Sequence, residues 1–374
     1  MIIRSEDFKN TCSKILTAVD SNELSAITET LELKTEGTFL YLNVTNREYF
    51  AQVKIDLGEV EELHATVNAN LFLKLISQIT TDTIEFENTE TSLIVKGNGK
   101  YELPLIFDGA SLLKLPEIVI ENVTSEFSIN SDILRSILLY NSKELTKGSI
   151  SKPVQKLYYV DEQGAITFTS GACVNSFNLE KPVKLLLNNR LVKLFKLFKE
   201  GAVKFTLGYD ALSDDIIQTK VKFESDEITL TAILSCDDSL LRKVPVAAIR
   251  GRANNDYPYS INISKDALIQ TINRLLLFNS SSGNKEVIKP YSTFEFGKDT
   301  VTVYDIHKNN KEILYYNNTI LDMQETYTAV LDLGDLKTTL ESCTEPYLTL
   351  QFGDNTAVVI TRGNIKNVIP ECTT

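Results

Sequence analysis

Residues 259–278, with the sequence YSINISKDALIQTINRLLLF, join a short alternating strand to a polar cap and an amphipathic helix. Ser264 and Asp266 lie where this helix is expected to begin, and an acidic side chain there offsets the positive end of the helix dipole. The same arrangement occurs as FSINSDILRSILL at residues 127–139 and as IIRSEDFKNTCSKIL at residues 2–16. The copies start roughly 125–135 residues apart, which is a domain-sized spacing.

A second pattern also occurs three times and consists of a strand, a helix of about three turns and an alternating strand. Its copies are ATVNANLFLKLISQI at 65–79, VKLLLNNRLVKLFKLFK at 183–199 and YTAVLDLGDLKTTLESC at 327–343. We therefore predict an α+β fold of three repeated domains, at residues 1–123, 124–252 and 253–374, each with two helices and antiparallel sheets. The alternative is that unrelated α+β domains share these short patterns by chance.

Composition is that of an ordinary globular protein, because 43% of the 374 residues are hydrophobic and 24% are charged. This balance excludes a disordered chain, a collagen-like chain and a disulfide scaffold. We expect neither a transmembrane helix nor a secretory signal, because no run of 18 apolar residues occurs and the N-terminal stretch is polar. Five scattered cysteines without metal-ligand spacing indicate a reducing, cytoplasmic environment.

Charge is segregated between the predicted helices and the rest of the chain. The net charge is −12, yet the six helical segments contain 12 Lys and Arg against 6 Asp and Glu. In the segment 188–199, a helical projection places Leu191 and Phe195 on one face and Lys193 and Lys196 on the opposite face. Contact with a nucleic-acid backbone is one interpretation of this basic face. A solvated helix face and a membrane-surface helix are the other two.

The residues now described resemble a known family, the bacterial β sliding clamp, which is the β subunit of DNA polymerase III. The clearest similarities are in residues 29–56, ETLELKTEGTFLYLNVTNREYFAQVKID, in 65–79, in AITFTSGACV at 165–174 and in NVIP at 367–370. The resemblance implies a DNA-clamp fold in which each chain forms half of a dimeric ring, with the helices inside and the sheets outside. Such a ring is a processivity factor in DNA replication that encircles duplex DNA without sequence preference. It tethers the replicative DNA polymerase and other DNA-processing proteins, and a clamp loader places it on DNA.

The resemblance implies three sets of site residues. The inner, DNA-binding face would contain Lys9, Lys14, Lys74, Arg135, Lys143, Arg190, Lys193, Lys196, Lys199 and Arg274. The pocket for a partner peptide would contain Thr169, Gly171, Val174, Lys243, Val244, Val368, Ile369 and Pro370. The homodimer interface would contain Tyr101 and Leu103 from the first domain, facing Leu277 and Phe278 from the third.

The pocket sequence departs from the family pattern. The family's His-Arg pair is replaced by Ala172 and Cys173, and the chain after Pro370 reads Glu-Cys-Thr-Thr instead of apolar and basic residues. These differences point to a divergent or phage-encoded member with a different preference for its binding motif.

No signature of an enzyme occurs in the sequence. The two histidines, His64 and His307, form no metal-binding motif, and nucleotide-binding and hydrolase glycine motifs are missing. We therefore expect no catalytic residue, no cofactor and no metal. Two other functions remain open, namely a non-catalytic interaction protein of several α+β domains and a DNA-binding module that does not form a ring.

Overall fold

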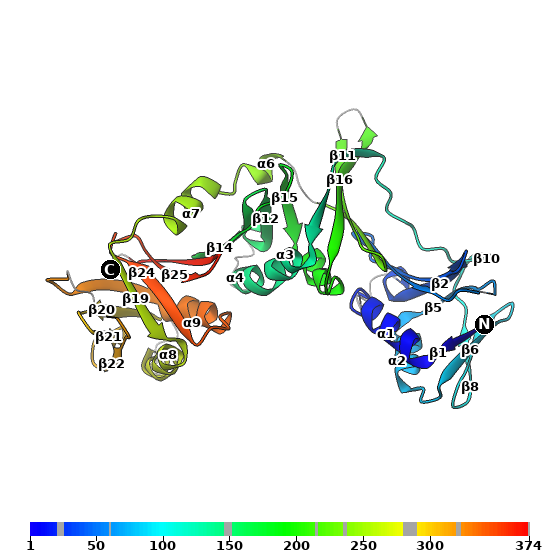
Figure 1. Cartoon of the computed structure of the whole chain (residues 1–374), viewed down its shortest axis with the longest axis horizontal. Helices are drawn as coiled ribbons and strands as arrows, with labels where there is room; N and C mark the ends of the chain where they lie inside the picture. Colours follow the sequence, from blue (N-terminus) through cyan, green and yellow to red (C-terminus); the bar gives the residue numbers. More distant parts are fainter. Residues whose placement is uncertain are drawn as a thin grey trace. The chain divides into compact units, whose positions relative to one another are not determined.

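A computed structural model describes residues 1–20, 26–59, 61–145, 152–213, 216–234, 238–279, 290–318 and 323–372. It contains two compact units (Figure 1). Unit 1 comprises Met1–Arg135 with Arg190–Ser235, and unit 2 comprises Ser136–Asn189 with Cys236–Thr374. The division falls inside the middle domain predicted from the sequence, so the limits 1–123, 124–252 and 253–374 stay a prediction.

The order of the elements repeats three times along the chain: strand, helix, four strands, helix, three strands. The first copy is β1 (Ile2–Arg4), α1 (Ser5–Leu16), β2 (Thr30–Glu36), β3 (Phe39–Thr45), β4 (Tyr49–Asp56), β5 (His64–Asn68), α2 (Ala69–Gln78), β6 (Thr83–Asn88), β7 (Ser92–Lys96) and β8 (Lys100–Pro104). It also contains the short 3-10 turn η1 (Ala26–Glu29) and is followed by a small ribbon of β9 (Phe107–Asp108) and β10 (Ser111–Leu112).

The second copy has the same order but less regular helices. It contains β11 (Asn122–Asn130), α3 (Ser131–Ser136), the π-helical turn η2 (Ile137–Asn141), α4 (Ser142–Leu145), the 3-10 turn η3 (Pro153–Lys156), β12 (Leu157–Asp161), β13 (Gly164–Phe168), β14 (Ala172–Ser176), β15 (Lys184–Asn188), α5 (Asn189–Lys193), the 3-10 turn η4 (Leu194–Leu197), β16 (Ala202–Ser213), β17 (Ile216–Glu224) and β18 (Ile228–Ile233). Two short helices follow it, α6 (Asp238–Leu241) and α7 (Val246–Ala253).

The third copy is regular again. It contains β19 (Tyr259–Ser264), α8 (Lys265–Asn279), β20 (Tyr291–Phe296), β21 (Thr300–Tyr304), β22 (Lys311–Tyr315), β23 (Tyr327–Asp332), α9 (Leu333–Glu341), β24 (Tyr347–Phe352), β25 (Ala357–Arg362) and β26 (Ile365–Pro370). The helix α9 begins where Asp332 accepts hydrogen bonds from the backbone N–H groups of Gly334 and Asp335, a regular side-chain N-cap.

The antiparallel sheets of the repeats join end to end. In unit 1 the eight-stranded sheet has the order β11-β16-β17-β18-β4-β3-β2-β5, so β18 of the second copy pairs with β4 of the first. In unit 2 the order is β15-β12-β13-β14-β26-β25-β24-β19, so β26 of the third copy pairs with β14 of the second. Both joins follow one rule: the last strand of one copy pairs with the fourth strand of the preceding copy.

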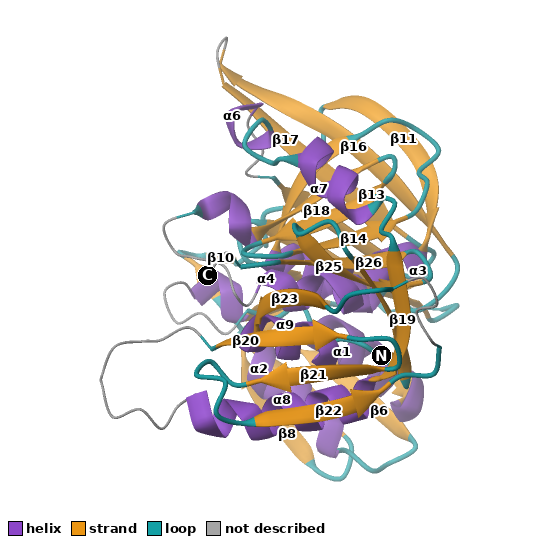
Figure 2. Cartoon of the chain, turned by 90° about the vertical axis from the view of Figure 1, so that its left-hand side faces the viewer, coloured by secondary structure: helices purple, strands orange, loops and turns teal. Residues whose placement is uncertain are grey.

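Each unit also contains one four-stranded sheet. These sheets have the orders β1-β6-β7-β8 in unit 1 and β22-β21-β20-β23 in unit 2, and Figure 2 shows β20, β21 and β22 side by side. Strand β8 is the last strand of the first copy, as β18 is of the second. Strand β22 is the fourth strand of the third copy, as β4 is of the first. Within the described part of the chain, each of these two strands has a neighbour on one side alone.

Aromatic clusters form the cores between helices and sheets. In the first copy the ring of Phe8 on α1 lies edge-on to Phe72 on α2 and Phe86 on β6, and all three are buried. In the third copy Phe296 stacks on Phe352 with ring centroids 4.1 Å apart. Helix periodicity and strand alternation thus place apolar side chains on a shared interior, as predicted for amphipathic elements.

The six predicted helical segments are helical, but two of them are irregular, and the short helices α6 and α7 were not predicted. The segment 131–143 contains a π turn, and 188–199 continues from α5 into η4. Helix α7 has weak local signals, because VAAIRGRA has no side-chain cap, no acidic residue in its first turn and a glycine, Gly251. Tertiary packing, described below, holds this segment in a helical conformation.

Replacing Phe352 by Ala should lower the free energy of unfolding by about 3–5 kcal/mol, because Phe352 is fully buried and the truncation leaves a cavity. A urea titration followed by circular dichroism would measure the change. The matched control is Tyr347→Ala on the same strand β24, where the side chain is 52% exposed and a small change is expected. Equal effects of both changes would contradict this assignment of the core.

Candidate nucleic-acid interface

A prominent basic feature is a row of four exposed side chains, three on α5 and η4 and the fourth, Lys199, two residues after η4. Two of them, Lys193 and Lys196, are exposed, whereas Leu194 and Phe195 beside them are 3% and 0% exposed. Since a 3-10 helix has three residues per turn, side chains three apart line up along one edge. The full row is Arg190, Lys193, Lys196 and Lys199. The irregular helix therefore keeps the basic face separate from the core.

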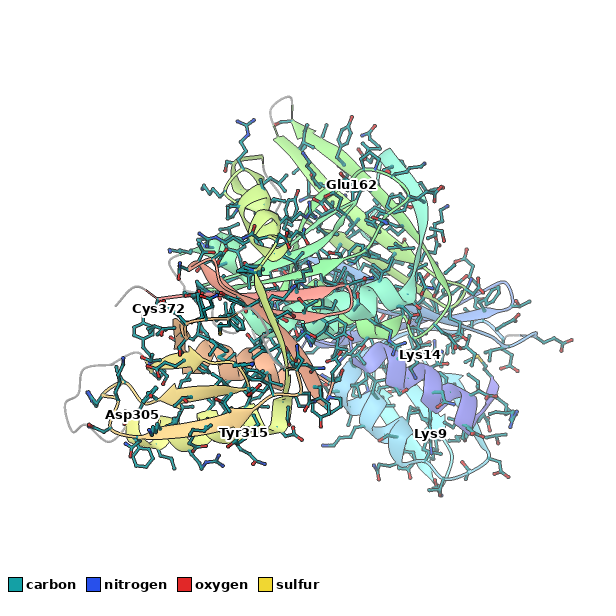
Figure 3. All side chains as sticks on the ribbon, turned by 60° about the vertical axis from the view of Figure 1, so that its left-hand side comes forward. Lys9, Lys14, Glu162, Asp305, Tyr315 and Cys372 are labelled. Carbon is teal, nitrogen blue, oxygen red and sulfur yellow. The ribbon has the colours of Figure 1, made fainter. Side chains whose placement is uncertain are left out.

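The helix α1 supplies two further lysines, which Figure 3 labels on the ribbon of that helix. Lys9 donates a hydrogen bond to the backbone oxygen of Ile79, and Lys14 forms an ion pair with Glu227. The neighbouring helix α2 contributes Lys74, which is exposed. Thus the first copy carries cations on both of its helices, although two of them also have partners within the protein.

Acidic side chains accompany two arginines of the predicted DNA-binding set in unit 1. The Arg190 guanidinium lies 3.7 Å from the carboxylate of Asp20 and 3.6 Å from that of Glu48. Arg135 on α3 approaches Asp132 and donates to the backbone oxygen of Lys199 at 2.9 Å. By contrast, no ion pair of Lys193 or Lys196 occurs among the residues described. These internal counter-ions reduce the positive charge that a phosphate would meet.

In unit 2 the basic positions are Lys143 on α4, which is exposed, and Arg274 on α8. Arg274 forms a bidentate ion pair with Glu312 on β22, with an Nε–oxygen distance of 2.6 Å. The hydrogen bond from Arg274 is the main reason that the pKa of Glu312 lies below its ordinary value. Arg274 is therefore held against the four-stranded sheet by a paired carboxylate.

The predicted partner-pocket residues divide into two groups in unit 2. Thr169, Ile369 and Pro370 line a cavity of about 410 Å³, together with Lys152, Gln155, Ser170, Tyr291, Asp332, Asp335 and Cys372. Gly171, next to Ser170, lies close to the backbone of β26, because a Cβ at this position would meet the backbone oxygen of Val368 at 2.6 Å.

The other pocket residues lie in or beside a hydrophobic cluster. Val174, Val244 and Val368 are 3%, 7% and 5% exposed and belong to one cluster with Ile249 of α7. Lys243, next to Val244, is exposed. The sequence pattern that predicts the pocket residues thus gives no indication that α7 of the same chain covers some of them.

The residues predicted for the dimer interface differ in exposure. Leu277 and Phe278 at the end of α8 are 68% and 48% exposed, and Tyr101 on β8 is partly exposed, whereas Leu103 on β8 is 3% exposed. The side chain of Leu103 therefore belongs to its own domain core in this chain.

Two exposed apolar residues on β22 were not singled out from the sequence. Ile313 and Tyr315 are 52% and 77% exposed, and Figure 3 labels Tyr315 on this strand. The alternation in KEILY at 311–315 is the signal that could have identified them.

The state of the Cys173 thiol and the grouping of metal-ligating side chains bear on whether the described residues offer a reactive or metal-binding site. Burial raises the pKa of the Cys173 thiol to about 12, so this thiol is protonated at neutral pH. No group of three or more metal-ligating side chains is present among the described residues, and Cys236 lies outside them. The described helices include none long and apolar enough to cross a membrane.

The fold is that of bacterial DNA polymerase III β sliding clamps. The chain superimposes on the Pseudomonas aeruginosa clamp bound to griselimycin with a TM-score of 0.79, covering 100% of this chain and 99% of that one. The β chain from Streptococcus pneumoniae gives 0.78 with 100% and 99% coverage, and the Bacillus subtilis clamp gives 0.75 with 100% and 98%. Sequence identity is 14% in all three. No family model matches the sequence, and no curated protein matches it either.

Reversing two charges on the basic row, Lys193→Glu with Lys196→Glu, should weaken binding to duplex DNA and leave folding intact, because both side chains are exposed. Loss of two phosphate contacts makes the slope of log K against log salt less negative by about 1.8. Fluorescence anisotropy at several salt concentrations measures this slope. The control is Lys114→Glu with Lys156→Glu, which makes the same charge change at exposed positions outside the predicted face. Equal slopes for the two double variants would contradict the assignment.

Removing a counter-ion should have the opposite effect. In Glu48→Gln, Arg190 loses one of its two carboxylate neighbours, so DNA affinity at low salt should rise about two- to fivefold. The same anisotropy titration measures it, with Glu36→Gln as a control for the change in net charge at an exposed site. An unchanged affinity in Glu48→Gln, or an equal rise in the control, would show that Arg190 does not contact DNA.

Proposed function

We propose that this protein is a DNA sliding clamp. Two copies close head to tail into a ring that encircles duplex DNA without sequence preference, and the ring acts as a processivity factor for a replicative DNA polymerase in the cytoplasm. The observation that supports this most is the pair of open edges, β8 and β22, in a chain whose other equivalent edges are joined. The shared fold with bacterial sliding clamps supports it independently.

The sheet edges favour a head-to-tail dimer. Strand β18 pairs with β4, and β26 pairs with β14, so the same rule applied to β22 calls for a last strand from another copy. That strand is β8, because it stands at the end of the first repeat. Pairing β8 of one protomer with β22 of the next satisfies backbone groups at both exposed edges. Two such contacts close the ring and leave neither kind of edge open.

The size of such a ring fits duplex DNA. Each chain supplies six helical segments from its repeats, so a dimer supplies twelve. At an interaxial spacing of about 8–10 Å, twelve helices form a circle roughly 30–38 Å across between axes. Subtracting about 10 Å for one helix diameter leaves a hole of roughly 20–28 Å, which admits duplex DNA.

The mechanism is topological, and weak electrostatic attraction assists it. A closed ring cannot leave DNA sideways, so it needs no tight contact with bases. Attraction between the basic row and phosphates is independent of sequence and allows sliding. The acidic remainder of the chain, which gives the net charge of −12, disfavours DNA at other surfaces.

The partners follow from the same proposal. A polymerase bound to the ring stays near its template, because tethering raises its effective concentration there. The cavity lined by Thr169, Ile369 and Pro370 is our candidate for part of the site that binds a short peptide of such a partner. A clamp loader would open the ring to place it on DNA.

The dimer should have a mass of about 84 kDa by light scattering, twice the 41.9 kDa of one chain. Leu277→Asp should shift it toward the monomer, because a charge would enter the predicted interface at the end of α8. The control Leu71→Asp changes another exposed helical leucine, 54% exposed on α2, and should leave the dimer unchanged. A stable monomer at micromolar concentration in the unmodified protein would contradict the ring.

A second measurement distinguishes a ring from an ordinary DNA-binding module. After loading, the protein should stay on circular plasmid and slide off linear plasmid of the same sequence, because a ring lacks tight contacts. Gel filtration of the complexes measures the retained fraction. Equal retention on both forms would favour a module that does not form a ring, and no binding to either would favour a non-catalytic interaction protein.

A further inference from the structure

Helix α7 covers an apolar surface of the sheet in unit 2. Ala172 and Val368 face each other across β14 and β26, and Val174 projects from the same side of the sheet. We call Val174, Val244 and Val368 the valine patch. Ile249 and Ala253 of α7, which are 9% and 1% exposed, complete its cluster, and α7 contacts both strands. In Figures 1 and 2 these strands lie between α7 and α9.

A small number of polar contacts hold α7 in place. Arg250 donates two hydrogen bonds to Asp161 at 2.7 and 2.5 Å, and the Asp161 side chain is 6% exposed. Burial opposes ionisation of Asp161, but the bonds from Arg250 keep its pKa below the ordinary value. Beyond the helix, Lys366 on β26 donates to Asn254 at 3.0 Å. Tyr257 also donates to the backbone oxygen of Arg252 at 2.9 Å, so these hydrogen bonds and the ion pair together anchor the segment.

The helix itself is weak. It has eight residues, its N-cap Pro245 provides no side-chain hydrogen bond, and Gly251 lies within it. Helices shorter than about 12 residues are marginal in water, and a Gly lowers helix stability further. Its other face is open, because Ala247, Ala248 and Arg252 are exposed. Packing on the valine patch, largely by Ile249 and Ala253, therefore decides whether α7 stays in place.

The surface beside α7 is already hollowed. A cavity of about 640 Å³ is lined by Val246, Ala247 and Arg250 of α7, by Leu241 at the end of α6 and Arg242 after it, and by Tyr159, Asp161, Gln163 and Lys184. A peptide can thus reach the edge of α7 before the helix moves. Since the residues predicted for partner binding include the valine patch, α7 occupies a surface that a partner would need.

We propose that α7 is a displaceable strap that regulates partner binding, and that a short apolar segment of a partner protein takes the place of Ile249 on the valine patch. Identification of that partner as a DNA-processing protein rests on the proposed function, whereas displacement of the strap does not. The apparent affinity for the partner is proportional to the fraction of molecules in which the strap is open. Any change that loosens α7 therefore tightens binding.

The test uses Ile249→Ser to weaken the strap and Ala248→Ser, at an exposed position of the same helix, as the matched control. The probe is a fluorescein-labelled synthetic peptide of residues 244–254, VPVAAIRGRAN, which presents the strap sequence in trans. Fluorescence anisotropy should show binding at least about tenfold tighter to Ile249→Ser than to the wild type, because loss of the apolar side chain opens the site. Ala248→Ser should bind as the wild type does.

Equal affinity of all three proteins for the peptide, or no binding to any of them, would overturn the proposal. If Ile249→Ser fails to fold by circular dichroism, Asp161→Asn with Arg250→Gln replaces it, because this pair removes both charges of the anchor together. The same tighter binding is then expected, and an unchanged affinity overturns the proposal.

Hydrogen exchange gives a second readout on the full-length protein. Amides of residues 246–253 should exchange by local opening, faster than those of β14 and β26, and Ile249→Ser should accelerate them alone. Exchange of α7 at the rate of the strands would overturn the proposal. Retention on circular plasmid, measured on the same proteins, tests the proposed function separately, since a strap can open whether or not a ring forms.

Discussion

Backbone hydrogen bonding at sheet edges is the constraint on which the rest of this structure depends. A strand with one free side leaves N–H and C=O groups unsatisfied and invites pairing with another chain. The repeats solve this twice within the chain, where β18 meets β4 and β26 meets β14. In the proposed ring, β8 and β22 each pair with a strand of a second copy of the chain, β8 with β22 and β22 with β8. In the proposed ring, the last strand of every copy therefore pairs with the fourth strand of a neighbouring copy.

Electrostatics then decides what such a ring can hold. The helices carry an excess of cations in a chain of net charge −12, and the row on α5 and η4 keeps its charges exposed. Other cations form ion pairs with carboxylates of the same chain, as Lys14 does with Glu227 and Arg274 with Glu312. Exposed pairs of this kind add little stability, so their larger effect is on the charge available to a ligand. Moderate rather than strong attraction suits a protein that must slide.

The repeated fold was predictable because helical periodicity and strand alternation are local signals that recur in each copy. Ser264 and Asp266 mark the start of α8, and the spacing of Leu191 and Phe195 gives the buried side of α5 and η4. The helix α7 was not predictable, because tertiary contacts of Ile249 override a sequence without caps. For the same reason the sequence could identify pocket residues such as Val174 but could not reveal what covers them. The joins between sheets are also non-local and carry no sequence signature.

The proposed ring makes one structural claim that can be observed directly, namely that β8 of one protomer lies beside β22 of another. Electron cryomicroscopy of the purified protein at micromolar concentration tests it. The account predicts closed two-chain particles in which Lys100–Pro104 and Lys311–Tyr315 form neighbouring antiparallel strands of one eight-stranded sheet. Dimers joined through any other surface, or open particles with both strands facing solvent, would contradict it.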